Sequence, residues 1–78
     1  MTDKELFKII KNCLKTKSLI NMKSSSKNLE EWDSLGQLAI LTTLDKKLKG
    51  KTSKLSQLAE ADTVNKIYKI LKKAKLIN

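Results

Sequence analysis

The chain has 78 residues, of which 17 are basic, all of them lysine, and 8 are acidic, so its formal net charge is +9. A chain of this length fits one small domain, which buries only about 60% of the surface that its unfolded form exposes, so a deep substrate cavity is not expected. The chain has no histidine and only one cysteine. This excludes serine–histidine and cysteine–histidine catalytic pairs, structural zinc sites and a disulfide framework. We therefore expect no catalytic residue and no metal ligand.

The positive charge could serve an anionic partner, either nucleic acid or a membrane surface. Lysine, however, lacks the planar fork with which arginine grips phosphates and guanine edges. One Trp, one Tyr and one Phe also leave little for stacking on bases. We expect a solvated lysine surface that binds no nucleic acid. A small basic module that binds nucleic acid or another protein remains the alternative function.

Neither targeting nor membrane-spanning features are expected. Residues 1–5 lack the basic region and apolar stretch of a secretory signal, and the longest apolar run, Leu38–Leu41, is far shorter than the roughly 20 residues that cross a bilayer. We expect a cytoplasmic protein without a membrane span. The single thiol, Cys13, suits a reducing compartment, and its place on an apolar helix face predicts that it is buried in the core.

The first segment has the 3.6-residue periodicity of an amphipathic helix of about three turns. Thr2 and Glu5 have the form of a capping box, which places the helix start near Asp3. The apolar positions are Leu6, Ile9, Ile10, Cys13 and Leu14.

Periodicity fades between residues 16 and 31, where serine and asparagine dominate, so this segment is predicted to be a long loop. Its apolar residues are expected to anchor it in the core, and the serine run 24–26 is interpreted as an ordinary flexible turn. The expected anchors are Leu19, Ile20, Met22 and Leu29.

A second helix is predicted over residues 34–48, with Gly50 as its stop. Either Ser34, paired with Gln37 in a capping box, or Asp33 one residue earlier could cap it. Leu35 and Leu38 fall outside its main apolar face and have no obvious place in the core. That face consists of Gln37, Ile40, Leu41, Leu44 and Leu48.

The rest of the chain predicts a short helical turn around residues 55–59, capped by Thr52 or Ser53, and a last helix from about Thr63, capped by Asp62. The apolar face of the last helix consists of Val64, Ile67, Tyr68 and Leu71, and Leu76 and Ile77 could extend it or fray. The expected fold is all-α: residues 1–78 form a single domain, a small four-helix bundle of three main helices and one short helix.

This arrangement resembles the acyl carrier protein family, the phosphopantetheine-binding carrier domains, over the whole chain. The shared features are the first helix, the long loop, Asp33-Ser34-Leu35 at the start of the second helix, the short third helix, and Thr63-Val64 at the start of the last. The resemblance implies that Ser34 carries phosphopantetheine from coenzyme A, on which an acyl or aminoacyl group is held as a thioester. A purely structural capping role for Ser34 is the alternative.

The resemblance also implies partner enzymes: a phosphopantetheinyl transferase, an acyl- or aminoacyl-loading ligase, and acyltransferases. Asp33 resembles the acidic residue that takes part in transferase recognition and its metal-bound site, and Leu35 and Leu38 are the expected apolar contacts. Glu30 and Glu31 extend the acidic entrance. For Leu38, coverage by the short third helix is weighed equally. The carrier itself is expected to be a non-catalytic monomer.

The chain also departs from the family. Many carriers present acidic residues along the second helix, where this chain has Ala39, Thr42, Thr43, Lys46 and Lys47. The tetrapeptide Trp-Asp-Ser-Leu at residues 32–35 resembles discrete carriers of specialised pathways. The implied role is a bacterial carrier dedicated to one biosynthetic pathway, for example of a surface polysaccharide, lipid or polyketide, rather than to bulk fatty-acid synthesis.

Overall fold

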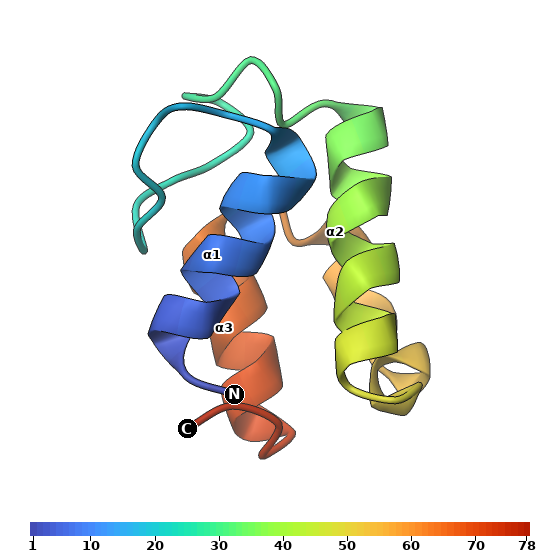
Figure 1. Ribbon diagram of the computed structural model, residues 1–78. Helices are drawn as coiled ribbons and strands as arrows, with labels where there is room; N and C mark the ends of the chain where they lie inside the picture. The colour runs from blue at the N-terminus through green and yellow to red at the C-terminus, as the bar shows by residue number, and fades with distance from the viewer.

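The computed structural model of the protein describes residues 1–78 and is all-helical (Figure 1). Three α-helices, α1 (Asp3–Leu14), α2 (Ser34–Lys47) and α3 (Val64–Lys73), pack together, and two 3₁₀ turns, η1 (Lys51–Lys54) and η2 (Ser56–Glu60), connect α2 to α3. The predicted all-α fold is confirmed, with the short helix realised as these two turns. None of the helices combines the length and apolarity that crossing a membrane requires.

Helix α1 follows its predicted bounds and face. Thr2 caps it, accepting a hydrogen bond from the Glu5 amide at 3.2 Å. Leu6, Ile10 and Leu14 are buried, whereas Cys13 is only half-buried, with Sγ 3.5 Å from the Ala39 carbonyl oxygen of α2. The prediction that Cys13 lies fully in the core is therefore wrong: it lies at the edge of the α1–α2 contact.

The loop between α1 and α2 is anchored by Ile20 and Leu29, both buried as predicted, and by Met22, which is half-buried. Leu19 was expected to be a fourth anchor, and this is wrong because its side chain is 83% exposed. Residues 19 and 20 lie in non-helical backbone, and of the two only Ile20 packs into the core.

The serine run is held against the start of α3 rather than being a flexible turn. The Ser26 amide donates to the Asp62 carbonyl at 2.9 Å, and the Val64 amide donates to the Ser24 carbonyl at 3.0 Å. Ser24 is buried, and its hydroxyl accepts a hydrogen bond from the Asn21 amide at 3.0 Å. These bonds join the long loop to the segment that precedes α3.

Two predicted caps are wrong. Neither Thr52 nor Ser53 caps a helical turn. The Thr52 side chain is buried and donates to Asp45 Oδ1 at 2.9 Å, which ties η1 to α2, and the Ser53 hydroxyl donates to the Gly50 carbonyl at 2.9 Å. Helix α3 is capped by Thr63, whose hydroxyl accepts from the Lys66 amide at 3.0 Å, and not by Asp62. Thr63 has the extended backbone typical of an N-cap, which aims its hydroxyl at the free amides of the first turn.

The core lies where the three helices meet. Its fully buried side chains come from all of them: Leu6, Ile10, Ile40, Leu44, Val64, Ile67 and Leu71. Helix α3 ends at Lys73, and Ile77 beyond it folds back into the core, where it is buried. The two termini lie side by side, joined by a hydrogen bond from the Asn78 amide to the Met1 carbonyl at 2.8 Å (Figure 1).

Candidate functional site

Ser34 is the first residue of α2, and its side chain is exposed. The residue before it provides the cap: Asp33 has extended backbone, and its Oδ1 accepts a hydrogen bond from the Gly36 amide at 2.9 Å. The Ser34 hydroxyl makes no hydrogen bond within the protein. Of the two predicted caps, the structure therefore has Asp33, and the Ser34 side chain has no structural task at this helix end.

Gln37 does not reach back to the helix start, as the predicted capping box requires. Its Oε1 accepts a hydrogen bond from the buried Trp32 indole at 2.6 Å, and its Nε2 donates to the carbonyls of Leu58 at 3.2 Å and Ala61 at 3.0 Å. A buried indole N–H needs an acceptor, and Gln37 supplies it. This side chain joins the long loop, α2 and η2 around Ser34.

Gly36 allows the loop to pass close to the first turn of α2. A Cβ atom at this position would lie 2.5 Å from the Glu31 carbonyl oxygen and 2.7 Å from Leu14 Cδ2. Sequence reasoning missed this role, although a glycine inside a helical pattern, which costs stability relative to alanine, can have a packing reason. Gly36 thus holds Glu31, Trp32 and Asp33 against the helix start.

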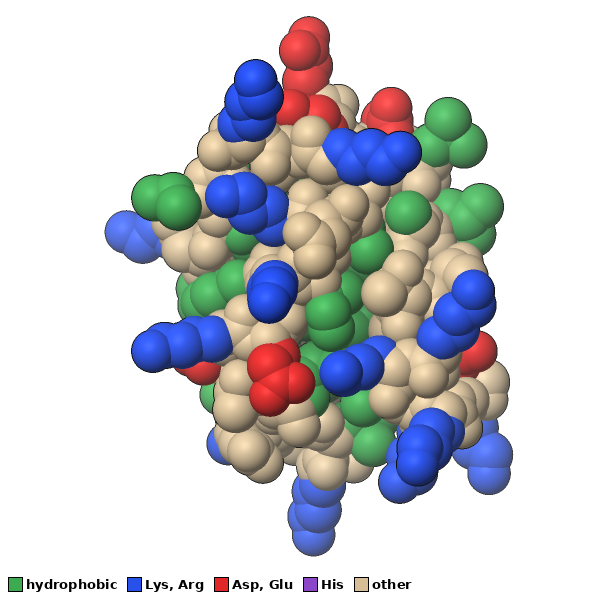
Figure 2. Space-filling model, in the orientation of Figure 1, with side chains coloured by type: hydrophobic (Ala, Val, Ile, Leu, Met, Phe, Trp, Pro, Cys, Tyr) green, Lys and Arg blue, Asp and Glu red, His purple; other side chains and the backbone are tan.

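An acidic rim surrounds Ser34. Glu30, Glu31 and Asp33 are exposed just before it in the chain, and Glu60 and Asp62 approach from η2 and the segment after it, so five of the eight carboxylates lie at this end. Figure 2 shows red side chains at the end where α2 begins, with lysines beside them and further red side chains lower on this face. The contributions of Glu60 and Asp62 were not predicted, because they depend on how η2 packs against α2.

A shallow depression of about 410 Å³ lies beside Ser34. Trp32, Gln37 and Ala59 form part of its wall, together with carboxylates of the acidic rim. Leu35 and Leu38 are 77% and 60% exposed, so the 3₁₀ turns leave Leu38 uncovered. Two large apolar side chains, an acidic rim and a free hydroxyl thus occur at one end of α2.

The Asp62 carboxylate of the acidic rim is the acceptor of the protein's one ion pair. Lys66 Nζ donates to its Oδ1 at 3.0 Å. This hydrogen bond, with the attraction between the two charges, lowers the pKa of Asp62 below its ordinary value. The Asp62 carboxylate therefore stays ionised to lower pH than an ordinary aspartate, with its charge balanced by Lys66.

Ser34 presents an exposed hydroxyl at the start of an α-helix. The start of an α-helix carries free amides and the positive end of the helix dipole, which favour an anion such as a phosphodiester. No group of three or more Cys, Asp or Glu side chains is placed to hold a metal ion. The chain contains no histidine that could act as a general base on this hydroxyl.

A scan against protein-family models, a search of curated proteins and a search of solved structures found no match to this chain.

Proposed function

We propose that the protein is a carrier, on which a phosphopantetheine arm attached to Ser34 holds an acyl or aminoacyl group and presents it to partner enzymes. The observation that carries this proposal is the exposed Ser34 hydroxyl at the start of α2, free of hydrogen bonds because Asp33 caps the helix. The resemblance of the Asp33-Ser34-Leu35 motif and helix order to carrier domains supports the same role.

The residues around Ser34 fit such an arm. The hydroxyl is accessible, the helix end favours the negative charge of a phosphodiester, and the depression beside Ser34 offers a shallow path along the surface. When attached, the arm supplies a terminal thiol that forms a thioester with its cargo. The protein itself contributes a rigid attachment point, and a tethered cargo has a raised effective concentration at a docked enzyme.

The surroundings of Ser34 also favour a particular kind of partner enzyme. Leu35 and Leu38 project from α2 as apolar contacts, and the acidic rim complements a basic surface around the active site of a transferase or loading ligase. Farther along α2, Lys46 and Lys47 are exposed and would repel such a basic surface. This difference in charge between the start and the end of α2 favours dedicated enzymes in one biosynthetic pathway over general fatty-acid synthesis enzymes.

Intact mass spectrometry tests the proposal. The purified protein, incubated with coenzyme A and a broad-specificity phosphopantetheinyl transferase, is expected to gain one phosphopantetheinyl unit, and Ser34→Ala is expected to gain none. Ser26→Ala is the matched control, because Ser26 lines the same depression and should leave modification intact. Absence of modification by every transferase tried, including one from the source organism, would overturn the proposal.

A nucleic-acid-binding module is the second candidate, favoured by one observation. With a single ion pair in the protein, 16 of the 17 lysines have no intramolecular carboxylate partner. Binding to a nucleic acid would neutralise several phosphates and weaken steeply as salt increases. Fluorescence anisotropy with duplex DNA, single-stranded DNA and RNA at low salt tests this candidate, and no binding to any of the three eliminates it.

A further inference from the structure

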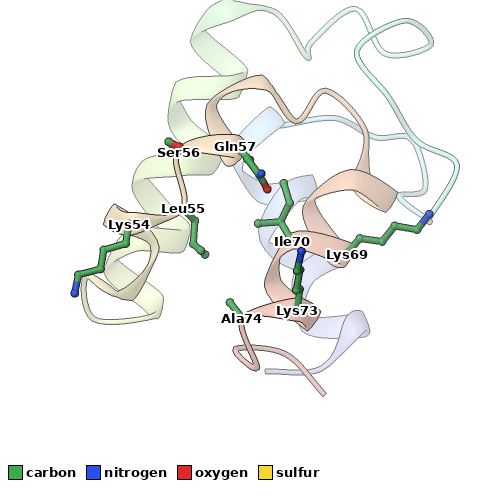
Figure 3. A pocket seen from close by; sticks show the side chains of 8 residues that line it. All are labelled: Lys54, Leu55, Ser56, Gln57, Lys69, Ile70, Lys73 and Ala74. Atoms are coloured by element: carbon green, nitrogen blue, oxygen red, sulfur yellow. The ribbon is translucent and has the colours of Figure 1, made fainter.

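A second hollow of about 540 Å³ lies between the 3₁₀ turns and α3, and it shares no residue with the depression beside Ser34. Figure 3 shows Leu55 of the 3₁₀ segment and Ile70 of α3 bordering it, with Lys54 and Lys69 extending away on opposite sides. We call this hollow the lysine groove. Three apolar and three basic side chains define it: Leu55, Ile70, Ala74, Lys54, Lys69 and Lys73.

The apolar floor of the lysine groove has a fixed position. Leu55 and Ile70 are half-buried, and both pack against the hydrophobic core. Ile70 lies on α3 between two residues that face the core, Ile67 and Leu71, so its outer edge is held at the surface. The floor is therefore an apolar contact point supported from below by the hydrophobic core.

The rim of the lysine groove is positive and has no internal counterion. No carboxylate lines it, and its two other lining residues, Ser56 and Gln57, are uncharged. The protein's ion pair involves Lys66, so none of the three lysines of the groove is paired. An occupant must therefore combine apolar and anionic groups.

The geometry distinguishes among anionic occupants. A small amphiphile has one head group, whereas Lys54 and Lys69 extend away from each other on opposite sides of the hollow (Figure 3). A nucleic acid offers only phosphates and bases to a floor without arginine or aromatic side chains. A protein segment can place apolar side chains on the floor and carboxylates on both sides.

We propose that the lysine groove is a docking site for an acidic amphipathic helix of a partner protein. Apolar side chains of this helix lie between Leu55 and Ile70, and its glutamates or aspartates contact the flanking lysines, which gives an apolar centre with a charged rim. A helix suits the groove because it can present apolar side chains on one face and carboxylates on both sides of that face. The proposal does not depend on the role of Ser34.

A synthetic peptide tests this proposal directly. The probe is a lactam-stapled peptide of three helical turns, with leucines on one face and glutamates on both sides of it, titrated into the ¹⁵N-labelled full chain. Chemical-shift changes are expected at Leu55, Ile70 and Ala74. Lys69→Glu/Lys73→Glu should weaken binding roughly tenfold or more, whereas Lys4→Glu/Lys8→Glu, with the same change in net charge on α1, should weaken it less than about threefold.

A second peptide and a further variant serve as controls. A peptide with serine in place of leucine keeps its charge and should lose binding, and Ser34→Ala should leave binding of the original peptide unchanged. Three results would show non-specific charge attraction and overturn the proposal. They are equal binding of both peptides, an equal loss of affinity in both double variants, and chemical-shift changes spread over all lysine surfaces. No binding also overturns it, as does binding of decyl phosphate in the groove without binding of the peptide.

Discussion

At the scale of single residues, Asp33 has two separable properties: its oxygen caps α2, and its charge belongs to the acidic rim. Asp33→Asn keeps an oxygen that can accept from the Gly36 amide and removes the charge, whereas Asp33→Ala removes both. The two variants therefore separate the stability of the helix start from recognition by a transferase.

We expect Asp33→Ala to lower the free energy of unfolding by about 1 kcal/mol, and Asp33→Asn to change it by only a few tenths. Both should slow modification of Ser34 if the charge serves recognition. Urea denaturation followed by circular dichroism measures the first effect, and mass spectrometry over a time course measures the second. Full-rate modification of Asp33→Asn would contradict a role for the charge.

Gly36 and Gly50 are needed for different reasons. A Cβ at Gly36 meets a backbone carbonyl that cannot move away, so Gly36→Ala is expected to lower the free energy of unfolding by about 1–3 kcal/mol. Gly50 has a left-handed φ of 81° with open space around it, so Gly50→Ala should cost about 1 kcal/mol from backbone strain alone. Denaturation curves of both variants measure these free energies. An unchanged free energy of unfolding in Gly36→Ala would contradict the close approach of the loop backbone to Gly36.

At the scale of elements, three sets of interactions meet at the start of α3. Thr63 caps the helix, the segment before it bonds to the serine run of the loop, and Asp62 pairs with Lys66 one turn later. The pair is exposed, so its contribution to stability is small. Its pH dependence nevertheless has a definite sign.

The lowered pKa of Asp62, caused first by the hydrogen bond from Lys66, means that the pair stabilises the folded state above the ordinary pKa of the carboxyl. This contribution is lost as pH falls through the lowered folded-state value. The melting temperature of the wild type should therefore be slightly higher than that of Lys66→Gln at neutral pH, and the difference should narrow as the pH falls below roughly 4. A melting-temperature difference independent of pH from 7 to 3 would contradict the pairing.

The helical elements followed from sequence, but parts of the site did not. The face of α1 was predictable because Leu6, Ile10 and Leu14 repeat at helical spacing. The cap of α2 was not, because aspartate and serine cap equally well and only the backbone geometry selects Asp33. The approach of Glu60 to Ser34 depends on contacts between segments far apart in sequence, mainly those made by Gln37, and local patterns carry no such information.

At the scale of the whole molecule, positive charges outnumber negative ones, and the negative ones are unevenly distributed over the surface. A net charge of +9 is contained within extents of 28 × 22 × 17 Å, and five of the eight carboxylates lie around Ser34. Lysines elsewhere repel one another with little local compensation, which destabilises the compact state. The end that bears Ser34 and the surface with the lysine groove therefore differ in the sign of their charged side chains.

Added salt should consequently stabilise the protein. The Debye length falls from about 30 Å at 0.01 M to about 10 Å at 0.1 M, so repulsion across the whole molecule becomes screened. We expect the melting temperature to rise over this range of sodium chloride, with little change in a sucrose control of matched osmolality. A constant or falling melting temperature in salt would show that lysine repulsion does not limit stability.

The position of Trp32 gives the protein a built-in reporter. It is the single tryptophan, it is 4% exposed, and its indole bonds to Gln37 at the wall of the depression beside Ser34. All tryptophan fluorescence of the chain therefore originates next to the proposed attachment point. Attachment of an arm, arrival of cargo or docking of an enzyme at this end can be followed in real time by emission intensity, with no dye and no substitution.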